Sequence, residues 1–72
     1  MTNNTIDIFR YNLKYYRKQR NLTQEELSEI SGISTDYLSE IERGKGTPSF
    51  KRMELIANAL NIEVYKLFMP ME

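Results

Sequence analysis

Apolar residues recur at helical spacing along nearly the whole chain, with polar residues between them. In the first such stretch, Phe9, Leu13 and Tyr16 follow i, i+4, i+7 spacing, which places them within about 60° of one another on a helical wheel. The pattern predicts a helix from about Ile6 to Arg20, with Thr5 as its N-cap. No stretch alternates β-branched and polar residues in the way that predicts a strand.

A second helix is predicted to begin directly after Thr23. Thr23 and Glu26 have the spacing of a capping box, in which each side chain accepts a hydrogen bond from the other residue's backbone N–H. Leu27 and Ile30 form the predicted buried face of this helix. Gly32 is predicted to end it, because glycine adopts the positive φ that helix ends often require.

A third helix follows almost at once, with Ser34 as its predicted N-cap. Leu38 and Ile41 form its predicted buried face, and it is expected to end at Gly44. Because only a short turn joins the second and third helices, they are expected to cross steeply, as in a helix-turn-helix. A steep corner between helices is also an ordinary packing feature, so this geometry alone leaves both interpretations open.

The remaining chain predicts a loop and two more helices. Residues 44–48 hold three of the five Gly and Pro residues, which marks a loop. Ser49 is the predicted cap of a fourth helix that ends at Asn61, and a short fifth helix is expected from about Val64 to Phe68. The predicted inward-facing residues of the fourth helix are Phe50, Met53, Ile56, Ala57 and Leu60. The sequence therefore predicts an all-α fold, a compact five-helix bundle, as a single domain over residues 1–72.

The composition excludes several kinds of chemistry. The chain has no Cys and no His, so disulfides, a thiol nucleophile, Cys-ligated zinc and the commonest general base are absent. We therefore expect no metal, no cofactor and no enzymatic activity. No apolar run approaches the roughly 20 residues that span a membrane, and the polar N-terminus is unlike a signal peptide. The expected location is the cytoplasm.

Charge is balanced in sum but not in order. Ten Lys and Arg oppose ten Asp and Glu, which excludes a polycation that coats nucleic acid through net charge. Residues 10–20 nevertheless hold five bases and no acids, residues 25–42 six acids and no bases, and residues 43–52 four bases and no acids. The two basic blocks bracket the predicted helix-turn-helix. Glu25 and Glu29 are then expected on the outer side of the second helix.

The stretch LKYYRKQRNLTQEELSEISGISTDYLSEIERGKGTP, residues 13–48, carries the strongest family signal. It resembles the lambda-repressor-like helix-turn-helix family (Cro/C1, xenobiotic-response-element type), over about residues 8–68 in all. The matching pieces are Arg17, Leu22–Leu27, Gly32, Tyr37-Leu38, Ile41-Glu42, Gly44-Lys45, Pro48-Ser49 and Ile56-Ala57-x-Ala59-Leu60. The resemblance implies a DNA-binding regulator whose helix-turn-helix spans about residues 23–43.

The resemblance also assigns roles to individual positions. Gln24 corresponds to a phosphate-holding residue at a helix N-terminus, where free N–H groups attract an anion. Asp36 and Glu40 stand where many relatives carry Gln or Arg. An acid at such a position is repelled by DNA unless it accepts a hydrogen bond from a base, such as one from cytosine N4. For each of these positions the alternative is a role without DNA, in which the residue starts a helix, packs against a neighbour or is simply solvated. The implied DNA-contacting positions are Thr23, Gln24, Thr35, Asp36, Tyr37, Ser39, Glu40, Arg43 and Lys45.

Two further sets of residues receive other roles. Arg17 and Glu42 resemble the family's structural salt bridge between the first and third helices. Apolar residues of the fourth helix and the C-terminal segment suggest a symmetric dimer interface, with scattered surface apolarity as the alternative. These residues are Leu55, Val64, Tyr65 and Met69.

The leading hypothesis is a sequence-specific transcriptional regulator that binds a palindromic or pseudopalindromic operator in double-stranded DNA as a homodimer. The family that the chain resembles includes phage repressors, restriction–modification controllers and antitoxins. A repressor or an autoregulating controller fits the length of this chain. The alternative is an antitoxin or adaptor-type protein-interaction module that uses the same fold for an unknown protein partner. Neither hypothesis involves a membrane.

Overall fold

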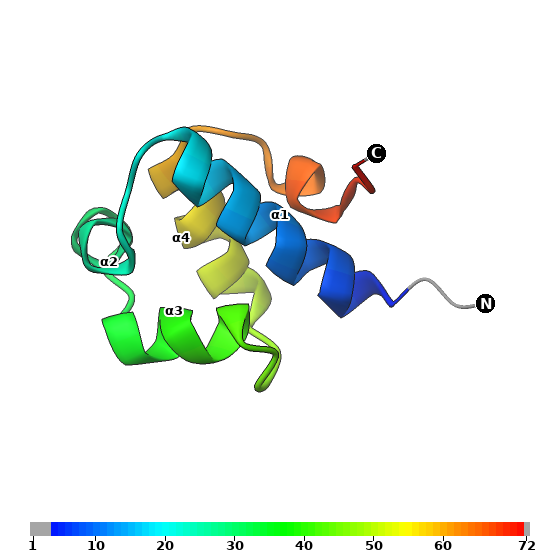
Figure 1. Ribbon diagram of the computed structural model, residues 1–72, viewed down its shortest axis with the longest axis horizontal. Helices are drawn as coiled ribbons and strands as arrows, with labels where there is room; N and C mark the ends of the chain where they lie inside the picture. The colour runs from blue at the N-terminus through cyan, green and yellow to red at the C-terminus, as the bar shows by residue number, and fades with distance from the viewer. Residues whose placement is uncertain (1–3, 72) are drawn as a thin grey trace.

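The computed structural model describes residues 4–71. Its helices are α1 (Thr5–Gln19), α2 (Gln24–Ser31), α3 (Thr35–Glu42), α4 (Phe50–Leu60) and the 3-10 helix η1 (Val64–Phe68), and no strand occurs among these residues (Figure 1). The prediction of an all-helical fold is confirmed. The prediction of five α-helices is wrong, because the last segment is a 3-10 helix. Short terminal pieces commonly take this tighter form.

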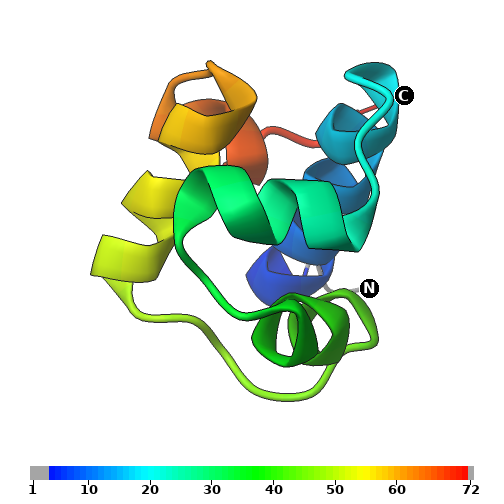
Figure 2. The same cartoon turned by 90° about the vertical axis from the view of Figure 1, so that its left-hand side faces the viewer.

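The helices enclose one small core. In Figure 1, α3 lies on the opposite side of α1 from η1, and α2 is seen end-on at the left. Figure 2 shows α2 lying across the view and α3 nearly end-on below it, so the two helices cross steeply as predicted. The buried apolar side chains that fill the centre are Phe9, Leu13, Leu27, Ile33, Leu38, Ile41, Ile56, Ala57, Leu60 and Leu67.

Capping side chains define where the helices begin. At Thr23 both hydrogen bonds of the predicted capping box are present. Ser34 and Ser49 cap α3 and α4 as predicted, each accepting from a backbone N–H in the first turn. The predicted cap of α1 is one residue late, because Asn4 Oδ1 accepts from Ile6 N at 3.1 Å and Thr5 is already helical.

Two apolar residues predicted to face inward lie on the surface instead. Ile30 is 57% exposed and Phe50 is 64% exposed. On α2 the core-facing stripe runs from Leu27 to Ser31, which is only 7% exposed. Ile30 lies on the other side of Leu27 around the helix. Phe50 is the first residue of α4 and lies beyond the part of that helix that its neighbours cover.

A buried asparagine joins α1 to the C-terminal segment. Asn12 is fully buried between Phe9 and Leu13 on the inner face of α1. Its Nδ2 donates to the carbonyl oxygens of Lys66 at 3.2 Å, Leu67 at 3.1 Å and Met69 at 2.7 Å. This one amide therefore holds η1 and the residue that follows it against α1.

Candidate nucleic-acid interface

The turn between α2 and α3 is fixed from within. Gly32 ends α2 with φ +79°, and a Cβ at this position would meet no atom within 4 Å. The requirement for glycine is therefore conformational rather than steric. The next residue, Ile33, is buried, and its N–H donates to Ser31 Oγ at 3.1 Å. These contacts set α3 at its steep angle to α2.

A network centred on Glu42 locks α3 to α1 and to the start of α2. Arg17 Nε donates to Glu42 Oε2 at 2.7 Å, and Arg17 Nη2 donates to Oε1 at 3.0 Å. Arg17 Nη1 also donates to the Leu22 carbonyl at 2.7 Å. Both charges are buried to nine-tenths or more of the side chain, so each depends on the other for stabilisation.

Gln24 belongs to the same network. Its Nε2 donates to Glu42 Oε1 at 3.0 Å, and the residue is half-buried at the first position of α2. A side-chain amide has two N–H donors and a carbonyl acceptor, so the bond to Glu42 fixes the orientation of Gln24 and still leaves a donor. Thr23, just before it, is exposed. Sequence reasoning did not predict the link between Gln24 and Glu42, because no local pattern joins residues 18 positions apart.

The outward face of α3 carries short polar side chains with unused hydrogen-bonding capacity. Asp36 and Glu40 are exposed, and Thr35 and Ser39 are half-buried. Within residues 4–71, none of these four side chains forms a hydrogen bond or an ion pair. Their donors and acceptors are therefore available to an external partner.

Basic side chains flank α3 beyond its two ends. Arg52 of α4 lies with its guanidinium carbon 4.8 Å from the Tyr37 ring centroid, a cation–π arrangement that holds the tyrosine against α4. Arg43 Nε donates back to the Ser39 carbonyl at 3.3 Å, and Lys45 is exposed in the following loop. Arg10 reaches this loop from α1, where it pairs with Asp7 and lies beside Gly44. The sequence carried no local signal for the contact of Arg52 with Tyr37 or for that of Arg10 with Gly44.

The residues proposed for a dimer interface fall into two groups. Tyr65 is 59% exposed and Met69 is 51% exposed. Leu55 and Val64 are partly buried and pack against the core. The first pair therefore offers exposed apolar surface, whereas the second pair contributes mainly to the core.

Other kinds of site find no support in the described part of the chain. Within residues 4–71, no three His, Cys, Asp or Glu side chains are grouped so that they would hold a metal ion. None of the helices described is long and apolar enough to cross a membrane.

Known proteins share this arrangement. A family model described as helix-turn-helix matches residues 13–67. The chain is 44% identical over 52 residues to the immunity repressor protein of Bacillus phage phi105, a match that covers 72% of this chain and 36% of that protein. The chain thus spans only about a third of the length of that repressor.

Two solved structures are similar along almost their whole length. The restriction-modification controller protein C.AhdI from Aeromonas hydrophila superposes with a TM-score of 0.84 and 33% identity, over 88% of this chain and 96% of that one. The master regulator for biofilm formation SinR, solved in complex with DNA, superposes with a TM-score of 0.80 and 32% identity, over 85% of this chain and 98% of that one.

Proposed function

This chain belongs to the helix-turn-helix family, and we propose that it is a sequence-specific regulator of transcription that binds double-stranded DNA as a homodimer. The observation that carries the proposal is the outward face of α3, whose polar side chains have no partners within residues 4–71. The relatives are regulators and repressors rather than enzymes. Action on an operator would place the chain in the cytoplasm.

In the proposed complex, α3 lies in the major groove and its N-terminal half reads base edges. Thr35 and Ser39 offer hydroxyls that donate or accept, whereas Asp36 and Glu40 only accept and so suit cytosine N4. Tyr37, Arg43 and Lys45 contact the sugar-phosphate backbone. These contacts fix the register of α3 without reading sequence.

The start of α2 supplies a second backbone contact. Its first N–H groups and the positive end of its dipole attract a phosphate, and Thr23 and Gln24 stand at this end. The bond from Gln24 to Glu42 holds the side chain in place before DNA arrives. The Arg17–Glu42 pair thereby acts on structure and on the shape of the interface, not on bases directly.

A dimer extends the few base contacts of one domain to two half-sites. In helix-turn-helix dimers these half-sites lie about 34 Å apart, one turn of DNA, so the operator has two-fold symmetry. Exposed Tyr65 and Met69, together with the partly buried Leu55 and Val64, form the proposed interface. Similarity to a phage repressor and to restriction-modification controllers supports a repressor or an autoregulating controller.

Selection from a random duplex library at moderate salt tests this function, followed by footprinting upstream of the chain's own coding region. We expect one symmetric sequence to be enriched and protected. If no selected duplex binds better than random DNA, the proposal is wrong, and the acidic surface would then be tested against protein partners.

A further inference from the structure

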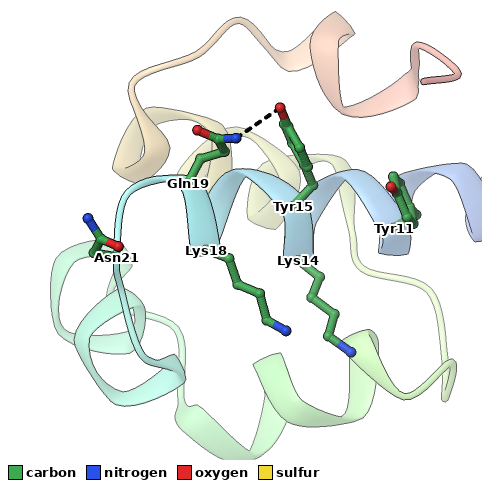
Figure 3. A pocket seen from close by; sticks show the side chains of 6 residues that line it. All are labelled: Tyr11, Lys14, Tyr15, Lys18, Gln19 and Asn21. Atoms are coloured by element: carbon green, nitrogen blue, oxygen red, sulfur yellow. Dashed lines mark hydrogen bonds between the residues drawn. The ribbon is translucent and has the colours of Figure 1, made fainter. Parts of the chain in front are cut away.

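Two lysines of α1 extend toward the side of the molecule that α3 occupies. Lys14 and Lys18 are exposed, and in Figure 3 their side chains run side by side from α1 in the direction of α3. Neither forms a hydrogen bond or ion pair with any residue from 4 to 71. Both charges are therefore uncompensated within the described chain.

Other polar side chains near the end of α1 point away from α3. Tyr15 and Gln19 point the other way in Figure 3, and Gln19 Nε2 donates to the Tyr15 hydroxyl at 3.0 Å. Arg20 faces the far side as well, where it shares a hollow with residues of α4 and η1 and lies 5.9 Å from the Tyr16 ring centroid. Of the basic block at residues 10–20, Arg10 and Arg17 also lie toward α3 but are paired with Asp7 and Glu42, so Lys14 and Lys18 are the bases on this side without an ion-pair partner in the described chain.

Glu42, the buried acid of α3, does not cancel this pair. Glu42 is buried in its bidentate contact with Arg17, so its charge is already neutralised. The two lysines are four residues apart, about 6 Å along the helix axis. They lie on the last two turns of α1, just before the turn that leads to the α2 N-terminus.

We propose that Lys14 and Lys18 contact phosphates of the DNA strand that lies beside α1 when α3 occupies the major groove. The inference rests on the proposed function and deepens it. A lysine is a flexible point charge on a long stem, which suits a phosphate contact that carries no sequence information. Continuity with the α2 N-terminus and with the outward face of α3 favours a phosphate backbone over an acidic protein.

The salt dependence of DNA binding tests the assignment. Each phosphate contact changes the slope of log K against log salt by about 0.9. Using the duplex selected by the unsubstituted chain, Lys14→Gln/Lys18→Gln should make the slope shallower by about 1.8 for each half-site bound. Preference for the selected sequence over a base-substituted one should stay the same, because phosphates carry no sequence information.

Arg20→Gln is the matched control, since it removes a charge from the same basic block on the opposite side of α1. It should leave the slope of log K against log salt unchanged. All variants should have the melting temperature of the unsubstituted chain, because Lys14, Lys18 and Arg20 are exposed. An unchanged slope in the lysine variant, with specific binding intact, would overturn this inference alone. Absence of any preferred duplex for the unsubstituted chain would overturn the proposed function and this inference together.

Discussion

Arg17 connects α1 with two parts of the proposed interface. It joins α1 to α3 through Glu42 and to the α2 turn through the Leu22 carbonyl. Arg17 is only 8% exposed, and a buried arginine needs a carboxylate partner. Only the family resemblance pointed to Glu42, because a pair 25 residues apart leaves no local pattern.

Replacement of Arg17 by alanine should destabilise the fold. It would leave Glu42 buried without its counter-charge, at a cost of about 3 kcal/mol in the free energy of unfolding. For a domain of this size the melting temperature should fall by more than about 10 °C, which a thermal melt followed by circular dichroism would measure.

Thr35→Ala is the matched comparison at the interface. Thr35 is half-buried at the start of α3, and its hydroxyl bonds nothing within residues 4–71. We expect its melting temperature to stay nearly unchanged while affinity for the selected duplex falls. The reverse ranking of the two variants in melting temperature would contradict this division between support and recognition.

At the level of elements, local chemistry explains what was predictable. The starts of α2, α3 and α4 follow from Thr23, Ser34 and Ser49, because a cap acts within one helical turn. The side of a short helix that meets the core depends instead on its neighbours. The apolar pattern alone therefore predicts Ile30 in the core, whereas Ser31 is the buried residue.

The angle between α2 and α3 depends on the left-handed conformation at Gly32. Gly32→Ala should lower the free energy of unfolding by about 1 kcal/mol through backbone strain, since the space around the position is open. Gly32→Asn should cost less, because asparagine adopts this conformation more readily. Chemical denaturation measures both, and an equal loss in the two variants would point to a steric cause instead.

The tie between α1 and η1 depends on Asn12. Asn12→Ala removes the donor that serves three carbonyl oxygens, and we expect a loss of about 2 kcal/mol. Hydrogen exchange should rise most at the amides of η1 and least at those of α3. Asn58→Ala, at an exposed position of α4, is the control and should leave the exchange of η1 unchanged.

For the whole molecule, zero net charge conceals the difference between paired and exposed charges. Glu42 is neutralised by burial against Arg17, and Glu25 and Glu29 are exposed on α2. Lys14 and Lys18 extend toward the side of α3 and have no ion-pair partner within residues 4–71. The order of charges along the chain predicts the basic residues of α1 and the exposed acids of α2 in outline. The distribution of the lysines over the faces of α1 depends on how the helices pack, which the sequence order does not contain.

Weak overall attraction to DNA makes the proposed dimer important for binding. Tyr65→Arg places a charge on the exposed part of η1, and we expect sedimentation to show a shift from dimer to monomer. Binding to a full symmetric site should weaken, because two linked half-sites bind more tightly than either alone. Ile30→Arg is the control, since Ile30 is similarly exposed at 57% on α2, at the opposite end of the molecule from η1 in Figure 1. A dimer that survives Tyr65→Arg but dissociates with Ile30→Arg would move the interface from η1 to α2.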